Sequence, residues 1–206
     1  MVATSVEVLG LEELGDLKGL DKRVRSAASK ALNQTATQQR TVAARRILDQ
    51  SALPRGYIAP RNKRFYVSKR ARPDTLESRI TARGRRTSLS RFIRGKPARG
   101  GPLKIVIKPG YLRSLDRAFL LRVRRGDGLS DTQFNLALAV RVSDGDSIRN
   151  SSAAVEIFDN VFLLYGPSVQ QLFIDNRGRG VAEEIEDETV IRLSNNFLRL
   201  LDLANL

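Results

Sequence analysis

The strongest constraint on the fold is a long stretch, residues 21–50, in which small and apolar residues recur every three or four positions. That spacing places them on one face of an α-helix. The face is rich in alanine, so another helix or a sheet can approach it closely. Asp21 suits the N-cap position, and Pro54 and Gly56 end the pattern. The sequence therefore predicts a long N-terminal helix.

Residues 74–83 alternate in polarity, with Leu76, Ser78, Ile80 and Ala82 on one side and mostly polar residues on the other. Such alternation is typical of a half-buried strand. Other short apolar runs predict further strands over residues 6–9, 88–93, 103–108, 117–124 and 134–142. The turn-rich sequence RGDGLSD lies between the last two runs, which predicts that they pair as antiparallel neighbours.

The last part of the chain, residues 168–206, has helical periodicity. One helix is expected from Ser168, and a second is expected after Gly180. The second has an apolar stripe formed by Val181, Ile185, Thr189, Leu193, Phe197, Leu200 and Ala204. A run of acidic residues lies near its N-terminus, where the helix dipole stabilises negative charge.

Strands thus cluster in the middle of the sequence and helices at its ends, which predicts an α+β fold. We expect the N-terminal helix and the C-terminal helices to pack on a mostly antiparallel sheet of about four strands. Residues 54–73, rich in proline, lysine and arginine, are expected to form an extended basic arm, and residues 94–102 a basic loop. We expect residues 1–20 to form an N-terminal segment and residues 21–206 a single domain.

Charge is unevenly distributed along the chain. The net charge of +14 divides into −3 over residues 1–19, +24 over residues 20–125 and −7 over residues 126–206. A basic field of this strength attracts polyanions or acidic protein surfaces. The candidate DNA- or partner-facing residues are Arg61, Lys63, Arg64, Lys69, Arg70, Arg72, Arg85 and Arg86. Phe65 and Tyr66 lie among them and are candidates for stacking on bases. The alternative is a solvated arm that docks on an acidic neighbouring protein.

The composition excludes several kinds of chemistry. The sequence has no cysteine and no histidine, so it cannot form disulfides, thiolate metal sites or a Ser-His-Asp triad. No phosphate-loop signature is present. Two pairs of acids, Asp127 with Asp131 and Asp144 with Asp146, are expected in loops and could bind a divalent ion. Solvated loop acids are the simpler interpretation, so we expect no catalytic residues, metal ligands or cofactor.

The sequence also predicts no membrane association. No apolar run is long enough to cross a bilayer, and the N-terminus lacks the features of a signal peptide. We expect the chain to be made in the cytoplasm.

Four motifs occur in an order that resembles the phage minor tail protein Z family, also called tail completion proteins. They are ALNQTA at 31–36, LESRITARGRRTSLSRF at 76–92, LKIVIKPG followed by RAFLLRV between 103 and 123, and GPSV at 166–169. Two features depart from the family pattern. Asp116 and Arg117 replace the glycine expected before AFL, and the loop DGDSIRNSS is longer than expected.

The resemblance implies a structural virion protein, made in the host cytoplasm, that completes the tail at its head-proximal end. Such proteins form rings, often hexameric, at the head–tail joint around the DNA channel. The implied partners are further copies of the chain, a tail terminator, tail tube or head-completion protein, and genomic DNA in the lumen. Neighbouring copies would meet head to tail, basic middle against acidic C-terminal third. The candidate interface residues are Gly166, Pro167, Ser168, Glu183, Glu184 and Asp187.

Two other functions stay open at this point. One is a basic protein outside a virion that binds nucleic acid without sequence specificity, with an affinity that falls steeply with salt. The other, less favoured, is a metal-dependent nuclease that uses loop carboxylates such as Asp144 and Asp146.

Overall fold

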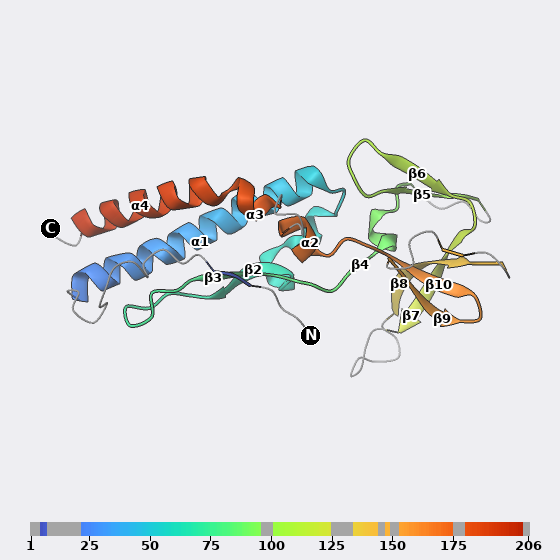
Figure 1. Ribbon diagram of the computed structural model, residues 1–206, viewed down its shortest axis with the longest axis horizontal. Coiled ribbons are helices and arrows are strands. Elements are labelled where there is room, and N and C mark those ends of the chain that lie inside the picture. The colour runs from blue at the N-terminus through green and yellow to red at the C-terminus, as the bar shows by residue number, and fades with distance from the viewer. Residues whose placement is uncertain are drawn as a thin grey trace. The chain divides into compact units, whose positions relative to one another are not determined.

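The computed structural model describes residues 5–7, 22–95, 101–124, 134–143, 147–148, 153–174 and 180–203. The chain forms two compact units (Figure 1). The first contains Met1–Leu48, Arg55–Arg85 and Val169–Leu206, and the second contains Asp49–Pro54 and Arg86–Ser168. The α+β fold class is confirmed, with helices and antiparallel strand pairs. The expected strands belong to separate sheets in the two units, and the single domain over residues 21–206 stays a prediction.

The first unit is built on α1 (Lys22–Gln50), which confirms the predicted long helix. Its buried face includes Ala31, Leu32, Ala43 and Ile47. The C-terminal helices are α2 (Val169–Phe173), α3 (Val181–Glu184) and α4 (Glu186–Asp202). The stretch that was expected to form one helix after Gly180 is divided at Ile185, whose backbone (φ −107°, ψ 3°) leaves the helical region between α3 and α4.

Helix α4 lies antiparallel to α1 (Figure 1). Near the start of α4, Glu188 Oε2 lies 3.5 Å from Arg46 Nη2. Further along α4, Asn196 donates a hydrogen bond of 2.9 Å to Thr35. The contacts therefore move toward the N-terminus of α1 as α4 proceeds.

A three-stranded antiparallel sheet belongs to the same unit. Its order is β1 (Ser5–Glu7), β3 (Arg79–Ala82), β2 (Phe65–Lys69). Ser78, Ile80 and Ala82 are buried, as the alternation over 74–83 predicted.

Residues 54–73 do not form an extended arm, which corrects the sequence-based expectation. They contain two short 3-10 helices, η1 (Arg55–Ile58) and η2 (Pro60–Asn62), followed by β2. The physical reason is a set of apolar anchors among the charges. Phe65 is 0% exposed, and its ring meets that of Phe173 edge-on with centroids 4.9 Å apart.

The second unit is mostly strand. It contains β4 (Thr87–Ser88), η3 (Leu89–Phe92), β5 (Leu103–Val106), β6 (Leu112–Leu115), β7 (Ala118–Arg124), β8 (Phe134–Arg141), β9 (Ala154–Phe158) and β10 (Val161–Gly166). One sheet has the order β4-β10-β8-β7, with β9 also paired to β10, while β5 and β6 form a separate hairpin. In the larger sheet, a core cluster of Ala137, Ala139, Val161 and Leu163 joins β8 to β10.

The antiparallel pairing of β7 with β8 is confirmed, with a register from Ala118↔Val140 to Arg124↔Phe134. Strands β6, β9 and β10 were not anticipated. The loop expected between β7 and β8, and most of the basic loop at 94–102, lie outside the described residues. None of the helices in the described ranges combines the length and the apolar character needed to cross a membrane.

Gly166 gives a test of packing in the second unit. A Cβ at this position would lie 2.9 Å from Cε2 of Phe92, a ring that is fully buried. Gly166→Ala should therefore destabilise the second unit by about 1–3 kcal/mol, the usual cost of overpacking a core. Urea denaturation measures this loss. Gly56→Ala is the matched control because nothing lies within 4 Å of its Cβ position. Equal stability of both variants would contradict the close contact with Phe92.

Candidate nucleic-acid and protein interface

The turn before β2 directs two of the candidate cations outward. Helix η2 begins with Pro60 at its first position, and Lys63 ends it in the left-handed region with φ 48°. The Lys63 amide donates to the Pro60 carbonyl, and the Asn62 side chain donates to the Gly56 carbonyl. These bonds fix the backbone of the turn, and Arg61 and Lys63 are exposed on it.

Arg64 has a structural role instead. Its guanidinium lies 4.1 Å from the centroid of the Tyr57 ring and donates a 3.1 Å hydrogen bond to the Tyr57 carbonyl. A cation held on a ring and a carbonyl in this way stabilises the loop. Arg64 is therefore a poor candidate for contact with a phosphate.

Arg40 on α1 holds the same segment from the other side. It donates from Nε to the Phe65 carbonyl at 3.0 Å and from Nη2 to the Ile58 carbonyl. Burial lowers the pKa of the Arg40 guanidinium from its ordinary value, but arginine stays charged at neutral pH. The helix therefore binds both η1 and β2 through one charged side chain that the sequence did not single out.

The aromatic candidates for stacking on bases are not both available. Phe65 is enclosed in the core of the first unit and cannot meet a base. Tyr66 is half-buried on the neighbouring position of β2.

The cations on and after β2 divide into paired and unpaired groups. Lys69 forms an ion pair with Glu77, and Arg79 Nη2 lies 3.0 Å from Glu77 Oε1. Arg70 and Arg72 are exposed and form no ion pair within the described part of the chain. The same holds for Arg85 in the first unit and for Arg86 in the second.

The carboxyl group of Glu77 is stabilised as an anion. The hydrogen bond from Lys69 is the largest cause that lowers the pKa of Glu77. Partial desolvation raises this pKa, whereas the charges of Lys69 and Arg79 lower it further. The pKa of Glu77 therefore lies below its ordinary value. A lowered pKa in the folded state means that this group stabilises the fold above its unfolded pKa. That contribution is lost as the pH falls through the folded pKa.

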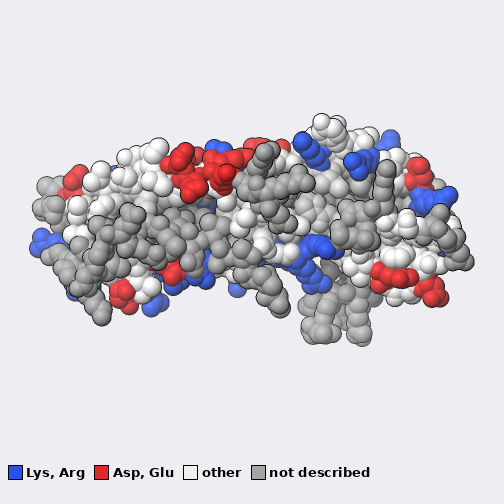
Figure 2. Space-filling model, in the orientation of Figure 1, with Lys and Arg blue, Asp and Glu red and all other residues white. Residues whose placement is uncertain are grey.

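The acidic candidates lie at α3 and the start of α4, where Figure 2 shows red side chains gathered. Glu184 is paired, since its Oε2 lies 3.3 Å from Nη1 of Arg46. Glu188 contacts both Arg46 and Arg192. Glu183 and Asp187 are exposed, and no ion pair to a described residue holds either of them. They are therefore the acids most available to a partner.

Gly166, Pro167 and Ser168 do not form an exposed docking surface. Gly166 and Pro167 are half-buried, Ser168 is buried, and Gly166 lies against the Phe92 ring. This corrects the expectation for the GPSV turn: in the structure it contributes to the packing of the second unit, because the missing side chain of Gly166 makes room for Phe92.

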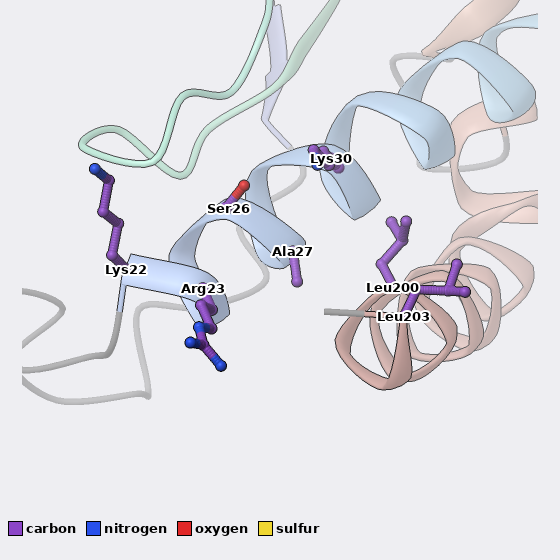
Figure 3. A pocket seen from close by; sticks show the side chains of 7 residues that line it. All are labelled: Lys22, Arg23, Ser26, Ala27, Lys30, Leu200 and Leu203. Atoms are coloured by element: carbon purple, nitrogen blue, oxygen red, sulfur yellow. The ribbon is translucent and has the colours of Figure 1, made fainter. Parts of the chain in front are cut away.

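A cavity of about 580 Å³ lies between the first turns of α1 and the end of α4 (Figure 3). Its lining residues are Lys22, Arg23, Ser26, Ala27, Lys30, Leu200 and Leu203. The figure shows the two leucines on α4 across from Ala27, with the cations on α1. This lining of apolar and cationic side chains suits binding of an anionic or amphipathic group and offers no acid–base pair for a reaction.

The described side chains also form no group of three or more acids that could hold a metal ion. Asp127, Asp131, Asp144 and Asp146, the acids of the nuclease hypothesis, lie outside the described residues. Comparisons with protein-family models, with curated proteins and with solved structures found no match.

Glu77 provides a pH-dependent test of the β2–β3 cluster. Glu77→Gln should lower stability at neutral pH and flatten the loss of stability on acidification, because the variant has no carboxyl group to protonate. Denaturant midpoints measured from pH 7 down to pH 3 check this. The control is Asp74→Asn, which should keep the wild-type profile. Asp74 is an exposed acid between β2 and β3 and forms no ion pair with a described residue. An unchanged profile for Glu77→Gln would show that the ion pairs contribute nothing.

Proposed function

We propose that this chain is a structural subunit of a tailed-phage particle that completes the tail at its head-proximal end. In this proposal, copies of the chain form a ring at the head–tail joint around the DNA channel, and the ring docks on neighbouring tail or neck proteins. The chain does no bond-making chemistry there. The order of the four motifs between residues 31 and 169 supports the family, and the charges of the described surfaces support the role.

The observation that carries the proposal is the separation of exposed charges of opposite sign that form no ion pair with any described residue. Arg61, Lys63 and Arg70 are exposed around η2 and β2. Glu183 and Asp187 are exposed on the C-terminal helices. Exposed charges of this kind are available to bind other molecules, and long-range attraction between such patches orients the partners before contact.

The two signs suggest two kinds of partner. Cations that ring a channel bind the phosphates of DNA without reading its sequence, because phosphate contacts carry no base information. The acidic surface suits a basic protein neighbour, including the basic part of another copy. A ring of identical subunits needs such a pair of different, complementary surfaces on every subunit.

The location in the particle is the most direct test. Cryo-electron microscopy of particles from the phage that encodes this chain should show its density as a ring between head and tail tube. Particles that lack the chain should contain heads and tails that do not join stably. Absence of the chain from purified particles would overturn the proposal.

The basic surface gives a second prediction. Arg61→Glu combined with Arg70→Glu should weaken binding to duplex DNA and reduce the slope of log affinity against log salt by about 0.9 for each phosphate that the variant no longer neutralises. Fluorescence anisotropy at several salt concentrations measures both quantities. Arg45→Glu combined with Arg91→Glu changes the net charge equally at exposed positions on α1 and η3, and it is the matched control.

If the two double variants bind DNA equally weakly, net charge alone explains binding and the η2–β2 surface has no special role. Tight binding of free DNA or RNA by a chain that never assembles would instead favour the nucleic-acid-binding alternative.

A further inference from the structure

Helix α4 exposes large aliphatic side chains. Val190, Ile191 and Leu198 are 63%, 61% and 55% exposed. With Asp187 and Ser194 they fall within an arc of about 100° on the helix surface, given 3.6 residues per turn. They therefore form one continuous stripe, which we call the α4 stripe. An amphipathic helix of a monomer normally turns its aliphatic residues inward.

The opposite side of α4 is held to α1 by polar contacts, and the apolar residues Leu193, Phe197 and Leu200 of α4 are half-buried. Asn196 donates to Thr35, and Arg199 donates to Gln34 at 2.7 Å. Part of the apolar surface of α4 is thus left exposed, while polar groups make part of the contact with α1. A contiguous exposed stripe of this kind marks a protein-binding surface.

The charge at the end of the α4 stripe restricts what can cover it. Asp187 lies on the stripe itself, and Glu183 is exposed on α3 just before it. Figure 2 shows the red cluster there and mostly white atoms further along α4. The occupant must therefore present apolar side chains beside positive charge.

A second α4 does not meet this requirement. Parallel pairing would bring the acidic ends together, which is repulsive. Antiparallel pairing would place each acidic end against the last turns of the other helix. The cation there is Arg199, which already binds Gln34, and Asp202 lies close to it in sequence.

The β5–β6 hairpin of the second unit has the required chemistry. Tyr111 and Leu112 are 64% and 58% exposed near its turn. Three exposed cations, Lys104, Lys108 and Arg113, belong to the same hairpin, and residues 103–115 contain no acid. The Lys108 ammonium lies 5.4 Å from the Tyr111 ring centroid, so cation and aromatic surface are adjacent.

The first strand of the hairpin is also held along its length by other residues of the second unit. Leu103 and Ile105 are buried, Arg94 donates its amide to the Lys104 carbonyl, and Ala52 donates its amide to the Ile107 carbonyl. Because this strand is held in place, less entropy is lost when the turn is ordered on a partner.

We propose that the α4 stripe binds the β5–β6 hairpin of a second copy of this chain, with Tyr111 and Leu112 covering Val190, Ile191 and Leu198, and Lys108 facing Asp187. This inference rests on the proposed function, in that it identifies the contact between neighbouring copies. Because the two surfaces differ, each copy binds one neighbour through its α4 stripe and the other neighbour through its hairpin. Such a contact produces a closed ring when the rotation that relates neighbouring copies adds up to a full turn.

Two single substitutions test the two surfaces. Ile191→Asp and Leu112→Asp should each weaken self-association by on the order of 100-fold, as expected for a central apolar contact. Sedimentation velocity over a range of concentrations measures the association. Thr41→Asp on α1 and Ser143→Asp after β8 add the same charge at exposed positions and are the matched controls. All four positions are exposed, so the thermal midpoint should stay at the wild-type value.

Mixing the two variants gives the sharpest result. Ile191→Asp retains an intact hairpin and Leu112→Asp retains an intact stripe, so an equimolar mixture should form a one-to-one dimer and stop there. Restored assembly on combining Asp187→Lys with Lys108→Glu in one chain would confirm the charged pair. If α4 paired with itself instead, Leu112→Asp would assemble alone as the wild type does, no dimer of one variant with the other would form, and the inference would be overturned.

The outcomes also separate this inference from the proposed function. If both Asp variants assemble like the wild type, the contact between stripe and hairpin is wrong, while the ring itself stands. If the effect of the substitutions is independent of concentration, the two surfaces meet within one chain and the inference fails. If the wild type stays monomeric at every concentration and is absent from particles, the inference and the proposed function both fail.

Discussion

The first unit depends on the way in which α1 binds the backbone of the segment that follows it. Arg40 donates to the carbonyls of Ile58 and Phe65, and Asn33 both donates to and accepts from the backbone of Ala71. These bonds satisfy polar groups that burial would otherwise leave unpaired at a cost of about 1–3 kcal/mol each. They hold a strongly cationic stretch, residues 55–72, against the helix. Without them, mutual repulsion of its charges would favour an extended chain.

This anchoring gives the basic residues different tasks. Arg40 and Arg64 are used within the fold, and Lys69 neutralises Glu77. Arg61, Lys63, Arg70 and Arg72 stay exposed. The acidic C-terminal helices show the same division, since Glu184 binds Arg46 while Glu183 and Asp187 remain available. Net charge therefore overstates the binding capacity of the chain, and the contacts of each side chain decide which charges can reach a partner.

Periodicity in the sequence predicted the elements that have one buried face. It predicted the long helix, the buried side chains of Ser78, Ile80 and Ala82, and the β7–β8 pair. The arm over 54–73 was wrong because Phe65 looks like one aromatic among charges, and only the contact with Phe173, far along the chain, shows that it is a core residue. The pairing of β10 with β4 and β8 depends on similarly distant contacts, so β10 was missed. The structural role of Arg64 was hidden for a related reason, because cation–ring geometry leaves no pattern in the sequence.

The first unit is assembled from segments that lie on both sides of the second in the sequence. During synthesis, the strands between residues 86 and 168 are complete while α4 is still missing from the helix pair. Since domains fold as their residues emerge, the basic hairpin is formed before the acidic, aliphatic helix α4. At that stage, for the contact proposed above, the chain has a folded hairpin but lacks the α4 stripe that would bind one.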